Sequence, residues 1–209
     1  MTDRPIPTVF LVDDYAPMRR SISRLLRAAG FFVAAFASAE EFLAQYDPGI
    51  RGCLVLDVAM PALNGLELQD ILAKAGSLLP IIFLTGEGDI PECVQAMKHG
   101  ASDFLTKPVD DEDLLAAVRV AIEKDSGLRR EQAELFEIRA RLATLTLRER
   151  EVLEYVVAGK LNKQIAGDLG TVEQTVKVHR ARVMQKMRVQ SVAELVRLTE
   201  RCGTNGSVH

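Results

Sequence analysis

The chain has 209 residues, of which 48% are hydrophobic and 26% are charged, and its formal net charge is −3. This length suits one large domain or two small ones, and the hydrophobic content is sufficient for a core in each. We expect a cytoplasmic protein, because the sequence holds no run of about 18 apolar residues and no basic, apolar leader. The three cysteines are odd in number and lack metal-ligand spacing, which argues against zinc sites and disulfides.

The charge is unevenly distributed along the chain. Residues 1–125 carry 11 Lys and Arg against 19 Asp and Glu, residues 126–143 carry 4 against 3, and residues 144–209 carry 11 against 7. An acidic front part, a nearly neutral connecting segment and a basic back part predict that only the back part meets nucleic acid. These three ranges are also the domain boundaries that we predict.

Short apolar runs alternate with helical patterns five times between residues 8 and 123. Turn-forming or polar residues bound each run, as is typical of strands that are buried on both faces. Five such units predict an α/β fold with a doubly wound, five-stranded parallel sheet of order 2-1-3-4-5 and helices on both faces. We expect strands over residues 8–12, 31–36, 54–57, 80–84 and 102–106, and helices over 17–29, 38–46, 66–75, 90–99 and 110–123.

Polar residues stand at the ends of four of these strands. Asp13 and Asp14 follow the first strand, Asp57 ends the third, Thr85 follows the fourth and Lys107 follows the fifth. Because the first and third strands are neighbours in this order, the groups converge. Three carboxylates in one pocket require a cation, an all-oxygen cluster favours Mg²⁺, and the lysine and threonine suit phosphoryl oxygens. Singly, the acids could be helix caps, the threonine a strand end and the lysine a solvated charge; together they predict a site.

Residues 8–123 resemble the receiver domain of two-component response regulators, which has a flavodoxin-like fold. The resemblance implies that Asp57 receives a phosphoryl group from a sensor histidine kinase. It also implies that Asp14, Asp57 and the Ala59 carbonyl bind Mg²⁺ or Mn²⁺, with Asp13 contacting the ion mostly through water, and that the peptide bond before Pro108 is cis. The matching residues are Asp13, Asp14, Asp57, Met60, Pro61, Gly65, Thr85, Lys107 and Pro108.

The same resemblance assigns Lys107 to the phosphoryl oxygens and makes Thr85 and Phe104 a pair that moves together on activation. Phe104 could instead be an ordinary core aromatic residue. Ala59 has no side chain that can orient an attacking water, and Glu87 adds charge near the site, so the lifetime of the phosphorylated state stays open.

Residues 126–145 are charged and low in β-branched residues, which predicts that a helix continues from the front part into the back part. The apolar residues of this stretch have the seven-residue spacing of a coiled-coil seam, although Gly127 weakens it. The alternative is a solvated spacer helix. The seam residues are Leu114, Ala121, Leu128, Leu135, Ile138, Leu142 and Leu145.

The back part begins with a capping box, in which Thr146 caps a helix and Glu149 closes the box. We expect Asn162 to cap the next helix, and a third helix to run from Gln174 to Met187. A short connection containing Gly170 joins the second helix to the third, as in a helix-turn-helix motif. The third helix is rich in cations, which suits either a solvated face or a recognition helix in a DNA major groove.

Residues 146–198 resemble the LuxR-type helix-turn-helix of the FixJ/NarL class, on the segments 147–153, 162–166 and 175–180. The resemblance implies a fourth helix over residues 192–198 that supports dimers. One departure is Thr171–Val172, which replaces an apolar residue and a Ser cap; Thr171 and Gln174 could form a capping box instead. The DNA-contacting residues that we expect are Asn162, Lys163, Thr175, Lys177, Val178, His179, Arg180, Arg182 and Lys186.

Together these features predict a transcriptional response regulator that catalyses only its own phosphoryl transfer and dephosphorylation. Phosphorylation of Asp57 would promote a homodimer that binds promoter DNA and activates transcription, with RNA polymerase as a further partner. A metal-dependent phosphohydrolase with Asp57 as nucleophile is the alternative, but Ala59 occupies the place of its second acid. A receiver fold that works without phosphate is a third possibility.

Overall fold

The computed structural model describes residues 6–86 and 97–203. They divide into an N-terminal unit (residues 1–129) and a C-terminal unit (residues 130–209), with the boundary inside helix α5 (Asp111–Ala143). Among the described residues, no helix has the length and apolar character that crossing a membrane requires.

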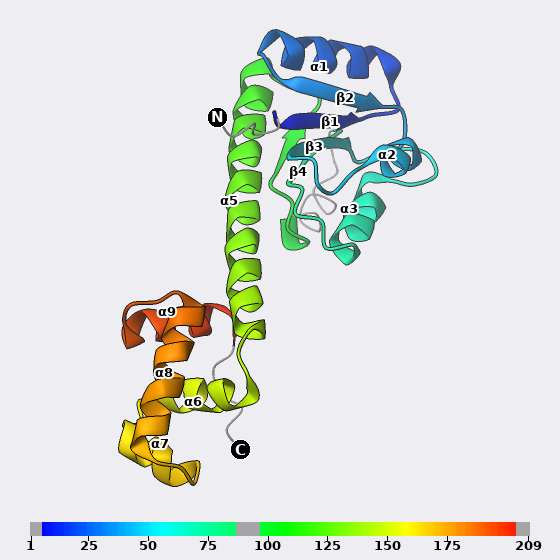
Figure 1. Ribbon diagram of the computed structural model, residues 1–209. Coiled ribbons are helices and arrows are strands. Elements are labelled where there is room, and N and C mark those ends of the chain that lie inside the picture. Colours follow the sequence, from blue (N-terminus) through cyan, green and yellow to red (C-terminus); the bar gives the residue numbers. More distant parts are fainter. Residues whose placement is uncertain (1–5, 87–96, 204–209) are drawn as a thin grey trace. The chain divides into compact units, whose positions relative to one another are not determined.

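The N-terminal unit is built on a parallel sheet of order β2-β1-β3-β4-β5 within its described residues, which confirms the predicted doubly wound topology (Figure 1). The predicted strand ends differ from the observed ones by no more than two residues. The helix predicted over residues 90–99 lies mostly outside the described residues, as does Glu87. The strands are β1 (Thr8–Val12), β2 (Phe32–Phe36), β3 (Gly52–Asp57), β4 (Ile81–Thr85) and β5 (Asp103–Thr106).

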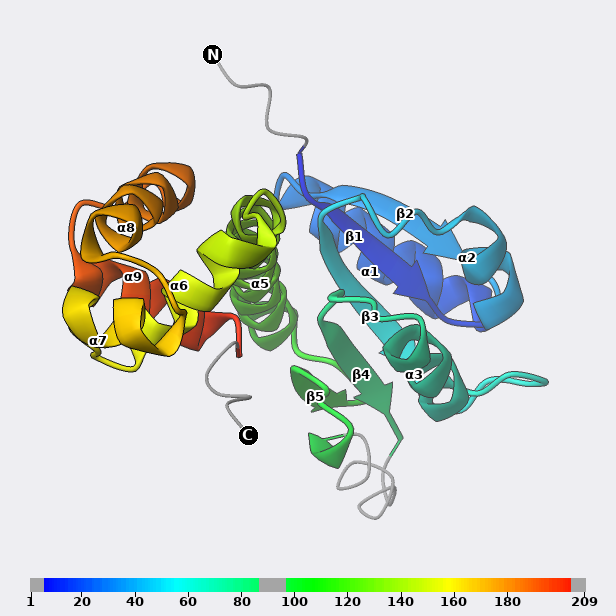
Figure 2. The ribbon, with the colours of Figure 1, turned by 60° about the horizontal axis from the view of Figure 1, so that its bottom comes forward.

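Helices cover both faces of this sheet, and α1 and α3 lie on opposite sides (Figure 2). Alternate residues of β1, β3 and β4 therefore enter two separate cores. One core places Leu54, Leu56 and Phe83 against α2 (Ala39–Gln45) and α3 (Gly65–Lys74). The other places Val55, Ile82 and Leu84 against α1 (Ala16–Ala28) and the first part of α5. Burial on both faces explains why β3 is continuously apolar up to its terminal aspartate.

The C-terminal unit consists, in its described part, of the end of α5 followed by four shorter helices. They are α6 (Leu147–Val157), α7 (Asn162–Asp168), α8 (Glu173–Met187) and α9 (Val192–Arg201). Apolar residues from each of them form a single core, including Val152, Ile165, Val176 and Leu195. The glycine-containing turn between α7 and α8 confirms the predicted helix-turn-helix.

The helix caps of the C-terminal unit agree with the sequence at one site and differ at two. Thr146 caps α6 and forms the predicted capping box with Glu149. Asn162 is the first residue of α7, and Leu161 before it is the cap. The side chain of Gln164 accepts a hydrogen bond from the backbone N–H of Leu161. The box predicted for Thr171 and Gln174 was wrong, since α8 starts after Val172, whose side chain cannot accept a capping hydrogen bond.

Helix α5 continues without a break through Gly127, as the sequence predicts. Most of its apolar residues with seven-residue spacing pack within one chain. Leu114 and Ala121 belong to the second sheet core, and Ile138 and Leu145 are buried in the C-terminal core with Leu142 packed against it. A coiled coil over the whole predicted seam would have to displace these residues, so the seam is at most short.

Candidate functional site

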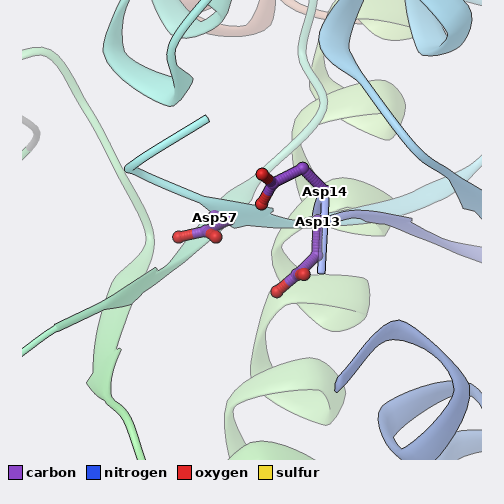
Figure 3. Close-up of side chains that lie close together, drawn as sticks. All are labelled: Asp13, Asp14 and Asp57. Atoms are coloured by element: carbon purple, nitrogen blue, oxygen red, sulfur yellow. The ribbon is translucent and has the colours of Figure 1, made fainter. Parts of the chain in front are cut away.

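The three strand-end acids lie together at one edge of the sheet (Figure 3). Val12 pairs with Leu56 in neighbouring strands, so Asp13, Asp14 and Asp57 follow at the same level. One oxygen from each carboxylate lies within 4.8 Å of the others. Asp13 and Asp57 are buried, whereas Asp14 is exposed. The convergence predicted from the strand order is therefore present in the structure.

Lys107 completes this cluster from the end of β5. Its Nζ lies 2.8 Å from Asp57 Oδ2 and 3.2 Å from Asp13 Oδ2. Its backbone N–H donates to the Thr85 carbonyl at 2.7 Å, which ties the chain after β5 to the end of β4. The Lys107–Pro108 bond is cis, as the resemblance implies. We call Asp13, Asp14, Asp57 and Lys107 the acid cluster.

Local backbone contacts hold two of these carboxylates in place. The N–H of Ala59 donates to Asp57 Oδ1 at 3.2 Å, and the N–H of Tyr15 donates to Asp13 Oδ1 at 2.8 Å. Gly65 allows α3 to begin directly against β3, because a Cβ there would lie 2.4 Å from the Asp57 carbonyl oxygen. A larger residue at position 65 would therefore displace the backbone of Asp57.

The electrostatics of the cluster are dominated by burial. Burial raises the pKa of Asp57 above its usual range, Lys107 opposes that rise, and the charge of Asp13 adds to it. Burial acts to lower the pKa of Lys107, but its contacts with Asp57 and Asp13 outweigh this, and the pKa is raised. One ammonium group thus contacts two of the three carboxyl groups. Carboxylate oxygens this close together fit a hard divalent cation such as Mg²⁺, which takes oxygen ligands at about 2.1 Å.

The two predicted switch residues have different environments. Thr85 is 1% exposed at the end of β4, whereas Phe104 on β5 is 39% exposed. The neighbouring position on β4 is Phe83, which lies in the core. The exposure of Phe104 is greater than that of a core aromatic residue, which favours its predicted role as a switch residue.

Most of the residues predicted to contact DNA lie on or near α8, and several are exposed. Lys163, Lys177, Val178 and Arg182 are exposed. Arg180 Nη1 donates to Asn162 Oδ1 at 2.9 Å, which connects α8 to the start of α7. Thr175 and His179 are partly buried on the same helix.

Lys186 is engaged inside the C-terminal unit. Its Nζ donates to Glu149 Oε2 at 2.6 Å and to the Thr144 carbonyl at 3.0 Å. The contact with Lys186, together with the N–H of Thr146, lowers the pKa of Glu149 to about 2. Lys186 therefore connects α8 to the cap of α6, although the sequence placed it with the DNA-contacting residues.

Arg19 also contacts the site, which the sequence did not predict. Its Nη1 donates to the backbone carbonyls of Asp13 at 2.6 Å and Asp14 at 3.2 Å. An arginine in the first turn of the helix that follows the two acids is the only signal that the sequence contains for this contact. Charge alone does not distinguish it from Arg20, which is exposed on the same helix.

Comparisons with known proteins assign each of the two units to a family. A family model described as "Response regulator receiver domain" matches residues 9–119, and one described as "Bacterial regulatory proteins, luxR family" matches residues 143–199. Nodulation protein W of Bradyrhizobium diazoefficiens is 46% identical over 199 residues, which cover 95% of this chain and 88% of that protein.

Two further relatives match the chain over nearly all of its length. The transcriptional regulatory protein FixJ of Azorhizobium caulinodans is 45% identical over 190 residues, covering 91% of this chain and 90% of that one. The solved structure of response regulator StyR is 44% identical, with a TM-score of 0.84, and covers 94% of this chain and 99% of that one. The chain therefore belongs to the response regulators that combine a receiver domain with a LuxR-type DNA-binding domain, the group that includes FixJ.

Proposed function

We propose that Asp57 accepts a phosphoryl group from a sensor histidine kinase and that this modification controls DNA binding by the C-terminal unit. The observation that carries the proposal is the acid cluster, in which Lys107 Nζ lies 2.8 Å from Asp57 Oδ2. In the transfer, an oxygen of Asp57 forms a bond to phosphorus while the bond from phosphorus to the kinase histidine breaks. Lys107 then has phosphoryl oxygens to donate to in place of the free carboxylate.

Asp13, Asp14, Asp57 and the Ala59 carbonyl are the residues that would hold Mg²⁺ or Mn²⁺ in the site. When bound, the ion would neutralise negative charge on the phosphoryl and carboxylate oxygens. The N–H of Tyr15 and Lys107 Nζ each donate to one oxygen of Asp13, so Asp13 is held beside the site and would contact the ion mostly through water. In this proposal the chain catalyses only its own phosphorylation and dephosphorylation.

The proposed switch uses Thr85 and Phe104. The Thr85 hydroxyl would move to donate to the phosphoryl oxygens, and the exposed ring of Phe104 would move inward with it. The surface around β5 would then change and promote a homodimer. Two C-terminal units would place their α8 helices in the major groove of a two-part promoter site, in the cytoplasm, and activate transcription together with RNA polymerase.

The test is to incubate the full chain with acetyl phosphate in the presence of Mg²⁺ and to measure its mass. We expect a stable increase of one phosphoryl group in the wild type and none in Asp57→Asn or after chelation of the metal. Continuous release of phosphate without a stable product would favour the phosphohydrolase. Unchanged labelling of Asp57→Asn would overturn the proposal.

A further inference from the structure

We propose that Arg19 is a positioning residue for the acid cluster: it holds the turn between β1 and α1 so that Asp13 and Asp14 both reach the site. This inference rests on the proposed function. Arg19 is the fourth residue of α1, and one nitrogen of its guanidinium, Nη1, donates to the backbone carbonyls of both acids.

The geometry of the chain explains why this turn needs support. Side chains of successive residues in a strand point to opposite faces of the sheet, so two adjacent acids converge only if the chain turns directly after the strand. β1 ends at Val12 and α1 begins at Ala16, which leaves three residues for the turn.

The carbonyls in this turn need hydrogen-bond donors. The first helical hydrogen bond of α1 runs from the N–H of Arg19 to the carbonyl of Tyr15. The carbonyls of Asp13 and Asp14 come before it, and Arg19 donates to each of them, at 2.6 and 3.2 Å. Because one guanidinium nitrogen joins the carbonyls of both acids to α1, removal of the guanidinium would loosen the turn.

Positioning and simple charge predict opposite effects on metal binding. The guanidinium is a cation near a proposed cation site, so its charge alone repels Mg²⁺. If charge were its only influence, the removal of Arg19 would strengthen Mg²⁺ binding. If Arg19 positions the acids, its removal weakens Mg²⁺ binding even though a repulsive charge has been lost.

The experiment is a calorimetric titration of the full chain with Mg²⁺, well below the temperature at which the chain unfolds. We expect Arg19→Ala to raise the dissociation constant by about tenfold, which is the lower end for residues that orient metal ligands. We expect Arg19→Lys to restore most of the affinity, because a single nitrogen makes both contacts in the wild type. Arg20→Ala is the matched control, since it removes the same charge from an exposed position on the same helix.

The outcomes separate this inference from the proposed function. If the wild type neither binds Mg²⁺ nor accepts phosphate from acetyl phosphate, the proposed function itself fails. If the wild type does both, the positioning role is overturned when Arg19→Ala binds Mg²⁺ as well as or better than the wild type. It is also overturned when Arg20→Ala weakens binding as much as Arg19→Ala does.

Discussion

At the scale of single residues, the acid cluster is poorly arranged for folding and well arranged for binding. Asp57 is 5% exposed and has a raised pKa, which means that burial disfavours its charged form. A buried charge requires a partner, and Lys107 provides one for both Asp57 and Asp13. The cluster keeps a negative charge that Lys107 does not neutralise, and this charge favours the binding of a cation.

Glu149 shows the opposite case, a buried acid whose environment stabilises its charge. It is 2% exposed, and Lys186 Nζ and the N–H of Thr146 both donate to Oε2. The pKa is lowered from 4.5 to about 2, so the folded state binds this proton more weakly than the unfolded chain does. The resulting stabilisation is present above about pH 4.5 and is lost as the pH falls towards 2.

We therefore expect Glu149→Gln to destabilise the C-terminal unit near neutral pH by about 1.5–3 kcal/mol, the value of a hydrogen bond to a charged group. The difference from the wild type should shrink as the pH falls through that window. Urea unfolding of the full chain at several pH values, read by pulsed hydrogen exchange at the amides of α6 and α8, measures it. Glu151→Gln is the control, because Glu151 pairs with Arg148 on the exposed surface. A pH-independent difference would contradict the assignment.

At the scale of elements, α5 is anchored to the N-terminal unit by an ion pair between the buried Asp125 and the partly exposed Arg129. Asp125 is 1% exposed; one of its oxygens accepts from Arg129 Nε at 2.6 Å and the other from the N–H of Gly52 at 3.2 Å. Arg129 also donates to the carbonyls of Pro48 and Ile50, both at 2.9 Å. These contacts attach the helix to the segment that precedes β3. Asp125 and Arg129 both lie after residue 119, where the match to the receiver family ends.

We expect Asp125→Ala to destabilise the N-terminal unit by about 1.5–3 kcal/mol, because the charged hydrogen bond between the buried Asp125 and the partly exposed Arg129 is lost. Hydrogen exchange should then increase in α5 around residues 122–129 and in the loop before β3. Mass spectrometry of peptides from the full chain measures both regions. Arg130→Ala, an exposed neighbour, is the control. Equal protection in Asp125→Ala and the wild type would show that the pair does not anchor the helix.

At the scale of the whole molecule, the functional residues of the two units have opposite charges. The acidic residues that could hold a cation and a phosphoryl group belong to the N-terminal unit, and the exposed cations of α8 belong to the C-terminal unit. Phosphate contacts make the affinity for DNA depend on salt, since each contact releases condensed counterions. The salt dependence therefore reports which cations meet DNA.

We expect Lys177→Ala to reduce the slope of the logarithm of DNA affinity against the logarithm of salt concentration by about 1. Lys186→Met should leave the slope unchanged and lower stability, because Lys186 is paired with Glu149. The measurement is fluorescence anisotropy of the full chain with mixed-sequence double-stranded DNA at several salt concentrations. Lys74→Ala, an exposed change in the N-terminal unit, is the control. If Lys186→Met lowered the slope and Lys177→Ala did not, the orientation of α8 would be wrong.

The sequence by itself determined most of the elements that the structure describes, the sheet order and the convergence of Asp13, Asp14, Asp57 and Lys107. These depend on apolar periodicity and on the rule that parallel strands end at one edge, both of which are local or topological properties. The C-terminal helix-turn-helix followed in the same way, from its cap at Thr146 and the turn at Gly170.

Only the tertiary structure decided which cations are partners of buried groups. Arg19, Arg129 and Lys186 look like ordinary surface cations in the sequence, and each is matched to carbonyls or a carboxylate by contacts that span from 4 to 81 positions along the chain. The caps at Leu161 and Val172 also differ from the local preference of Asn162 and Thr171. Apart from the four-residue spacing of Asp125 and Arg129 on one helix, these pairings depend on three-dimensional distance, which residue spacing does not encode.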